Sequence, residues 1–268
     1  MVNADALTFT CLLPVCADDD ADHCREALDS IAAATLAPDA LIICQDGPLP
    51  GGLEQVVAAC GARRVVNPGP RGLHHNLNHA IASVRTSWIC RADADDLNLP
   101  RRFETQVRFL AENSDVDVLG AGLIEFWPDG RTREKPMPMG HEAIIRRARY
   151  RNPINHMTAF VRTQALRAVG GYPDIPMKED YGLWLTMIAH GYRLANLDEP
   201  LVRARLGADF YRRRSGARHL ASEYALFKLK RNMADIGPAV AAAAFIARAG
   251  ALASATTARA VYETVLRR

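Results

Sequence analysis

Acidic residues stand at two places in the sequence where they could do chemistry. The first cluster, Asp93, Asp95 and Asp96, directly follows an apolar, strand-like run at 88–91. Three unpaired carboxylates this close together repel one another and raise each other's pKa values. A divalent cation removes that conflict, since carboxylate oxygens, water and substrate phosphates are the usual ligands of Mg²⁺. The alternative of a solvated turn, in which Asp95 or Asp96 caps the next helix, stays open.

The second acidic feature is the pair Glu179 and Asp180 at the start of a predicted helix over 180–190. A carboxylate at this position would stabilise the helix by ~0.3–1 kcal/mol through the helix dipole. Alternatively, a general base projects from this rigid element into a substrate cleft. Asp93 and Asp180 lie far apart in the sequence, so spacing alone does not bring the two acidic features together.

Short apolar runs alternate with helical stretches in the first half of the chain. The predicted strands and helices fall, in chain order, at 9–15, 21–34, 41–44, 54–60, 64–66, 77–84 and 88–91. Continuous apolar strands that alternate with helices predict an α/β fold with a mostly parallel sheet covered on both faces. Ligands bind at the carboxyl ends of the strands in such sheets, which is where the first acidic cluster lies.

The second half of the chain is less regular. Helices are predicted at 100–112, 143–150, 163–169 and 180–190, strands at 116–126 and 158–161, and a loop at 128–140. Gly191 ends the last of these helices as a C-cap. The alanine-rich tail at 239–268 is predicted to be helical, and it could dock on a membrane, bind a partner subunit or cap the core.

The composition is that of an ordinary globular protein. Of the 268 residues, 49% are hydrophobic and 24% are charged, which excludes a mainly disordered, collagen-like or disulfide-scaffold protein. The apolar run at 239–247 is much shorter than the ~20 residues of a membrane span, and the first residues lack the basic start of a secretory signal. We therefore expect a cytoplasmic protein with six reduced cysteines. The net charge of +3 is too small to indicate a nucleic-acid partner.

Several segments, in order, resemble the motifs of family 2 glycosyltransferases of the GT-A fold. They are LLPVCADDDADHCREALDSI, LIICQDGP, NPGPRGLHHNLNHAI, ICRADADDLNLPRRFETQVRFLAENSDVDVLGA, NPINHMTAFVRTQALRAVGGYPD and KEDYGLWLTMIAHGYRLANLDEPLVRAR. The fourth segment is similar to the family's R.DADD…P.RLE.Q..FL pattern. The resemblance extends over about residues 8–223. The later segments and RRRSG resemble bacterial enzymes of exopolysaccharide, capsule and O-antigen assembly.

The resemblance implies roles on the donor side of a site. Pro14, Val15 and Asp46 would contact the base of a UDP- or GDP-sugar, and Asp93 its ribose. Asp95 would hold a Mg²⁺ or Mn²⁺ ion that bridges the diphosphate, with Asp96 supporting the ion through water. The ion would stabilise the nucleoside diphosphate as it leaves.

On the acceptor side, Asp180 would deprotonate the acceptor hydroxyl as it attacks the anomeric carbon with inversion. Glu179 is placed on the same side. Trp184 follows one turn after Asp180 and is expected to pack beneath it at the acceptor site. His156, in the segment NPINH, is interpreted either as an acceptor-binding residue or as a hydrogen-bonded structural one.

Arg213 and Arg214 belong to a run of three arginines followed by Ser215 and Gly216. They could close over the diphosphate of the donor as a mobile loop. The alternatives, a cationic face that meets anionic lipid and a plain solvated surface, stay open.

His74, His75 and His79 form the pattern H-H-x-x-x-H. His75 and His79 have the i,i+4 spacing of zinc ligands on a helix. No glutamate completes H-E-x-x-H and the sequence offers no evident third ligand, so surface or substrate-facing histidines are favoured over zinc.

The resemblance thus predicts an inverting, metal-dependent glycosyltransferase with a saccharide or lipid-linked acceptor, in contact with the cytoplasmic face of the inner membrane. A GT-A domain would occupy 1–220, with a donor half at 1–97 and an acceptor half at 98–220, and a helical extension would occupy 221–268. Two alternatives remain. A nucleotidyltransferase would need a glycine-rich phosphate loop with a lysine, whereas PVCADDDAD is acidic. A binding or scaffold subunit would be favoured by loss of Asp95 or Asp180, which are both present.

Overall fold

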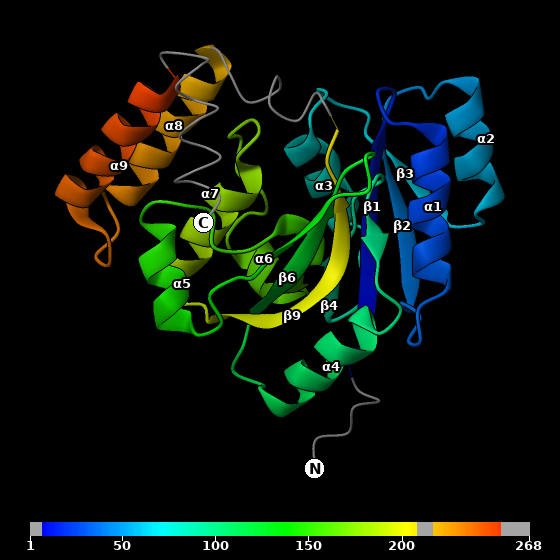
Figure 1. Cartoon of the computed structure of the whole chain (residues 1–268), viewed down its shortest axis with the longest axis horizontal. Coiled ribbons are helices and arrows are strands. Elements are labelled where there is room, and N and C mark those ends of the chain that lie inside the picture. The colour runs from blue at the N-terminus through cyan, green and yellow to red at the C-terminus, as the bar shows by residue number, and fades with distance from the viewer. Residues whose placement is uncertain (1–6, 208–216, 253–268) are drawn as a thin grey trace.

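A computed structural model describes residues 7–207 and 217–252 (Figure 1). These residues form one nine-stranded sheet in the order β3-β2-β1-β4-β8-β6-β9-β5, with β7 paired to β6. The strands are β1 Phe9–Cys16, β2 Ala40–Asp46, β3 Arg63–Val66, β4 Trp88–Arg91, β5 Leu97–Asn98, β6 Val118–Phe126, β7 Thr132–Lys135, β8 Phe160–Arg162 and β9 Leu194–Arg205. The α-helices are α1 Ala21–Ala32, α2 Gly51–Ala59, α3 Leu73–Ile81, α4 Arg102–Glu112, α5 His141–Ala148, α6 Thr163–Ala168, α7 Glu179–Ala189, α8 Ala217–Lys230 and α9 Gly237–Leu252.

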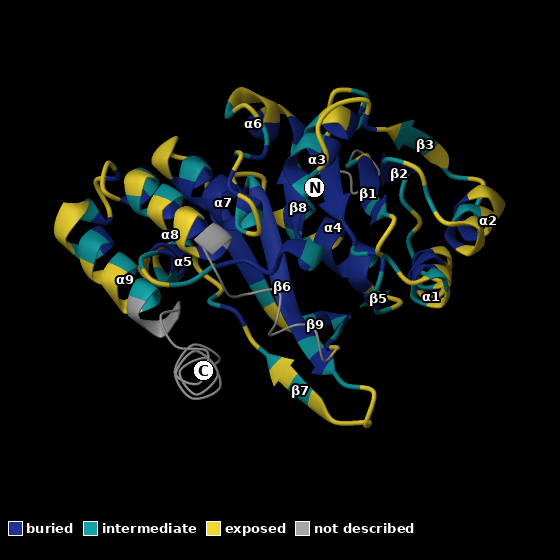
Figure 2. Ribbon diagram, turned by 90° about the horizontal axis from the view of Figure 1, so that it is seen from above, coloured by how far each residue is buried: buried dark blue, intermediate teal, exposed yellow. Residues whose placement is uncertain are grey.

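The sheet is covered by helices on both faces, as the apolar strands predict. Successive side chains of a strand point to opposite faces, so Leu12 of β1 packs in one core while Cys11 and Leu13 pack in the other. The first core is shared with α3, α5, α6 and α7, and the second with α1, α2 and α4. The strands in the middle of Figure 2 are correspondingly buried. The predicted α/β fold is confirmed.

Parallel ladders join β1 to β2, β1 to β4 and β2 to β3. The longest parallel ladder joins β6 to β9, whereas β8 runs antiparallel between β4 and β6. The predicted loop at 128–140 is wrong in part, because Thr132–Lys135 pairs with β6 as β7. Half of β7 is exposed and its residues are polar, so it lacks the apolar pattern of a buried strand.

Helices α8 and α9 pack together outside α7 (Figure 1). Helix α8 begins at Ala217, so the predicted boundary between 220 and 221 falls inside it. Leu226, Met233 and Ala241 are buried in the first core, so this pair of helices caps the core.

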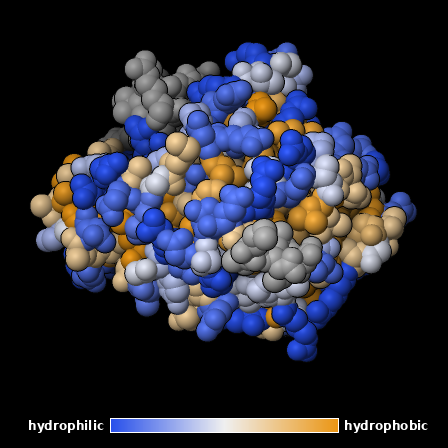
Figure 3. Space-filling model, turned by 90° about the horizontal axis from the view of Figure 1, so that it is seen from below, coloured by the Kyte–Doolittle hydropathy of each residue, from blue (hydrophilic) through white to orange (hydrophobic). Residues whose placement is uncertain are grey.

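No helix among the described residues has both the length and the apolarity to cross a bilayer. On the face seen in Figure 3, hydrophilic and hydrophobic residues are interspersed. All six cysteines are free, as predicted.

Candidate functional site

The carboxyl ends of β1, β2 and β4 meet at one edge of the sheet. Cys16 at the end of β1 pairs with Asp46 at the end of β2, and β4 runs beside β1 in the same direction. The acidic cluster follows β4 directly, so the topology puts its carboxylates at this edge. Ligands bind at this edge in open α/β sheets.

Carboxylate oxygens of Asp93, Asp95 and Asp96 lie within 4.8 Å of one another. Asp96 is only 4% exposed. Burial raises its pKa well above the usual range, and the charges of Asp93 and Asp95 add to this effect. Three oxygen donors that destabilise one another's charge fit a hard divalent cation such as Mg²⁺ or Mn²⁺.

Two arginines hold the acidic cluster in place. Arg91, buried at the end of β4, forms an ion pair with Asp93. The backbone N–H of Arg205, at the end of β9, donates to Oδ1 of Asp96 over 2.8 Å, and its Nε donates to the carbonyl oxygen of Asp95. No role was predicted for either arginine from the sequence. A charged residue inside the apolar run 88–91 could have pointed to Arg91, whereas the role of Arg205 depends on a strand that was not predicted.

Asp46 lies at the donor side of the predicted site, where its side chain is already held. Nδ2 of Asn67 donates to its Oδ1 over 3.0 Å, and the N–H of Gly72 donates to its Oδ2 over 2.9 Å. Pro14 on β1 is partly exposed and pairs with Cys44, two residues before Asp46 on β2. Val15 is 1% exposed and packs in the second core, so its backbone is the part that could contact a nucleotide.

Glu179 and Asp180 form the first turn of α7. Nδ2 of Asn152 donates to Oδ2 of Asp180 over 2.5 Å, and the N–H of Tyr181 donates to its Oδ1 over 2.7 Å. Glu179 is 8% exposed. Its pKa is raised to about 7, mainly by burial and also by the charges of Asp180 and Asp93, while Arg91 opposes the shift. Glu179 therefore interacts electrostatically with Asp180 beside it and with Asp93 of the first acidic cluster, although Asp93 is far away in the sequence.

His156 and Trp184 are both buried, and their ring centroids lie 6.3 Å apart. Nε2 of His156 lies 2.8 Å from the hydroxyl of Tyr172, which favours the structural interpretation of this histidine. Burial lowers its pKa well below the usual range, and Arg91 adds to that effect. Trp184 is 0% exposed and packs in the first core. The packing role predicted for Trp184 is confirmed, and the buried ring could support the acceptor site only from beneath.

Arg213 and Arg214, the predicted diphosphate contacts, lie outside the described residues.

Comparison with known proteins bears on this site. The model of the family "Glycosyl transferase family 2" matches residues 13–170, which include the whole acidic cluster. The chain is 30% identical over 233 residues to the amylovoran biosynthesis glycosyltransferase AmsE of Erwinia amylovora, covering 85% of this chain and 88% of that protein. It is 32% identical over 228 residues to the UDP-Gal:alpha-D-GlcNAc-diphosphoundecaprenol beta-1,3-galactosyltransferase of Escherichia coli, covering 82% of each.

Solved structures share the fold. S. aureus TarS 1–349 in complex with UDP-GlcNAc superposes with a TM-score of 0.69 at 16% identity, covering 90% of this chain and 72% of that one. The mannosyltransferase PcManGT of Pyrobaculum calidifontis, in complex with GDP-Man and Mn²⁺, has a TM-score of 0.59 at 18% identity, covering 95% and 78%. The family match spans more than half of the chain, and relatives of similar length cover more than four-fifths of it. The chain therefore belongs to glycosyl transferase family 2 and is a glycosyltransferase.

Proposed function

We propose that this glycosyltransferase is metal-dependent and inverting, and that it moves a sugar from a UDP- or GDP-sugar to a hydroxyl of a saccharide or lipid-linked acceptor. The observation that carries the proposal is the cluster of Asp93, Asp95 and Asp96 directly after β4, whose carboxylate oxygens lie within 4.8 Å of one another. A metal-binding carboxylate cluster and a separate carboxylate base are the two parts that such a transfer needs. The names of the relatives, which include amylovoran biosynthesis and a diphosphoundecaprenol-linked acceptor, support a role in surface-polysaccharide assembly. Contact with the cytoplasmic face of the inner membrane is part of the same proposal.

The donor half, about residues 1–97, would bind the nucleotide. Asp46, Pro14 and the backbone of Val15 would contact the base, and Asp93 the ribose. Asp95 would hold a Mg²⁺ or Mn²⁺ ion directly and Asp96 would support it through water. The bound ion would supply positive charge to the diphosphate as a Lewis acid. Arg91 contributes a second, permanent positive charge beside Asp93.

The acceptor half, about residues 98–220, would supply the base. Asp180 would take the proton of the acceptor hydroxyl while that oxygen forms a bond to the anomeric carbon. The bond from the anomeric carbon to the diphosphate oxygen breaks at the same time on the opposite face, so the configuration inverts. The hydrogen bond from Asn152 fixes the carboxylate of Asp180 in one orientation. The arginines 213 and 214 remain proposed diphosphate contacts, and the C-terminal helices a capping extension.

The proposal is tested by incubating the full chain with a panel of sugar nucleotides and saccharide or lipid-linked acceptors, with and without Mn²⁺. A transferase releases nucleoside diphosphate and an elongated acceptor of inverted anomeric configuration, and only with the metal. Release of pyrophosphate would instead indicate a nucleotidyltransferase. Donor binding without turnover across the panel would indicate a binding subunit, and retention of configuration would contradict the proposed chemistry.

A further inference from the structure

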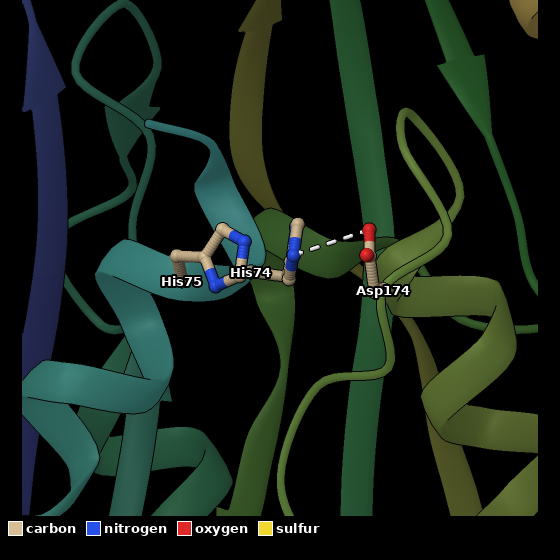
Figure 4. A group of neighbouring side chains, drawn as sticks. All are labelled: His74, His75 and Asp174. Carbon is tan, nitrogen blue, oxygen red and sulfur yellow. Dashed lines mark ion pairs between the residues drawn. The ribbon is translucent and has the colours of Figure 1, made fainter. Parts of the chain in front are cut away.

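A second cluster of ligand-type side chains lies apart from the carboxylate cluster. It consists of His74 and His75, in the first turn of α3, and Asp174, in the segment between α6 and α7 (Figure 4). One ligand atom from each residue lies within 4.8 Å of the other two. His74 stands between the other two side chains, and its ring centroid is 3.9 Å from that of His75. We call these three residues the histidine cluster.

The buried imidazole of His74 lacks an aligned partner. The residue is 8% exposed, and its Nε2 lies 3.2 Å from Oδ1 of Asp174. The two groups are not aligned as a hydrogen bond, and no other group of the described residues is hydrogen-bonded to this nitrogen. A buried nitrogen that faces a carboxylate without a hydrogen bond is costly, and a cation between the two would satisfy both.

The fold holds the histidine cluster together through Asn78. This residue follows His74 by one helical turn, so both side chains leave α3 on the same face. Nδ2 of Asn78 donates to the carbonyl oxygen of Tyr172, and the N–H of Tyr172 donates to Oδ1 of Asn78, each over 2.8 Å. Gly171 makes this approach possible, because a Cβ there would lie 2.3 Å from Oδ1 of Asn78. The chain is thereby fixed two residues before Asp174.

We propose that His74, His75 and Asp174 bind a borderline transition-metal ion such as Zn²⁺. Two imidazole nitrogens and one carboxylate oxygen are the ligands that zinc takes, and three protein ligands leave a fourth position for water. The donor set differs from that of the carboxylate cluster, which is made of hard oxygens alone. The side chain of Asp174 is 71% exposed, so the ion has a direct route from solvent.

The site would join the two sides of the catalytic centre. Gly72, two residues before His74, donates its N–H to Asp46 on the donor side. Asp174 lies in the segment that leads into α7, whose first turn holds Glu179 and Asp180 on the acceptor side. An ion held by the histidine cluster fixes α3 against this segment, and it stabilises the folded chain because the unfolded chain has no preformed site.

The test is calorimetric titration of the full chain with Zn²⁺, after treatment with EDTA and in the presence of millimolar Mg²⁺ to occupy the carboxylate cluster. Asp174→Asn and His75→Gln remove one ligand each at partly or fully exposed positions. His79→Gln is the matched control, because His79 is an exposed histidine of the same helix that does not belong to the cluster. Wild type and His79→Gln are expected to bind one Zn²⁺ per chain. Asp174→Asn and His75→Gln are expected to bind it at least about tenfold more weakly.

Absorption by Co²⁺ in place of Zn²⁺ reports ligand geometry without any activity measurement. Visible bands of four-coordinate Co²⁺ are expected in wild type and in His79→Gln, and they should be lost in the two ligand variants. The proposal is overturned by equal Zn²⁺ affinity in all four proteins, or by no Zn²⁺ binding in the presence of Mg²⁺, which would leave an ion pair only. It is also overturned if Asp95→Asn abolishes the binding, since the ion would then belong to the carboxylate cluster.

Discussion

The carboxylate cluster and the histidine cluster are two candidate metal sites that the fold assembles in different ways. Asp93, Asp95 and Asp96 come from one turn directly after β4, so their spacing in the sequence already brings them together. His74 and His75 meet Asp174 only because Asn78 holds the segment after α6 against α3. A site within one turn can be found in a sequence, whereas a site between distant segments depends on the topology.

The two clusters also differ in the charge that surrounds them. The carboxylate cluster brings three carboxylates together, and the pKa of Asp96 is raised by burial and by the charges of Asp93 and Asp95, although Arg91 forms an ion pair with Asp93. The histidine cluster has only one carboxylate, beside two imidazoles. The first cluster therefore suits a hard cation with phosphates, and the second a borderline cation without them.

The largest effect is expected for Asp180→Asn. If the transfer takes place between the carboxylate cluster and Asp180, and not at the histidine cluster, this substitution lowers kcat by ~10²–10⁴-fold, because an amide does not accept the proton of the acceptor. Donor affinity should stay nearly unchanged, since the base acts in the transition state. The measurement is steady-state release of nucleoside diphosphate. Asp22→Asn, at an exposed first-turn position of α1, is the control and should keep full activity. An active Asp180→Asn enzyme would remove Asp180 from the role of base.

The raised pKa of Glu179 predicts that the stability of the folded chain depends on pH. Burial and the neighbouring carboxylates raise the pKa of Glu179 to about 7 in the folded chain, from 4.5. The folded state therefore holds this proton more tightly, and the resulting stability is present below about pH 4.5 and is lost as the pH rises to about 7. The loss is of the order of 3 kcal/mol at most.

Urea unfolding between pH 5 and pH 8 measures this contribution. Glu179→Gln should flatten the decline of the unfolding free energy over that range and be more stable than wild type at pH 8. Glu142→Gln, at an exposed position in the first turn of α5, should leave the decline unchanged. Equal pH profiles in all three proteins would show that Glu179 is not destabilised by its surroundings.

A substitution at Gly171 tests the Asn78 contact that holds the histidine cluster together. This residue has a φ of 79°, and a Cβ would lie 2.3 Å from Oδ1 of Asn78. Gly171→Ala should therefore cost about 1–3 kcal/mol of unfolding free energy, from backbone strain and the lost Asn78 contact. Gly130→Ala is a matched control, because Gly130 has a φ of 85° with open space around it. It should show only the cost of the backbone strain. Equal losses in the two variants would mean that the Asn78 contact adds nothing.

Much of the first half of the fold could be predicted from the sequence, because its strands are buried on both faces. β1, β2 and β4 are continuous apolar runs and were predicted to within two residues at each end. β7 is polar and half exposed, so it gave no such pattern. β9 was not predicted, since Asp198, Glu199 and Pro200 interrupt it and β6 must shift register opposite them.

The candidate site could likewise be predicted only in part, where its residues stand together in the sequence or belong to a motif. The carboxylates that stand together in the sequence could be identified from their spacing, and Asp180 from its motif. Arg205 and Asp174 could not, because each reaches its place through tertiary packing. The core in which Val15 packs was also hidden, since the direction of a side chain in a strand depends on how the strand is placed in the sheet.

The smallest effect, and the one that separates the two clusters most directly, is expected for Asp95→Asn. Loss of one carboxylate weakens the hold on a hard cation, so affinity for the sugar nucleotide in the presence of Mn²⁺ should fall about tenfold, or about 1.4 kcal/mol. Zn²⁺ affinity at the histidine cluster should change by less than about twofold, because Asp95 supplies no ligand there. Calorimetric titrations of this variant with the sugar nucleotide and with Zn²⁺ measure the two affinities in one protein. If both affinities fell together, the clusters would be one coupled site, and if neither fell, Asp95 would hold no metal.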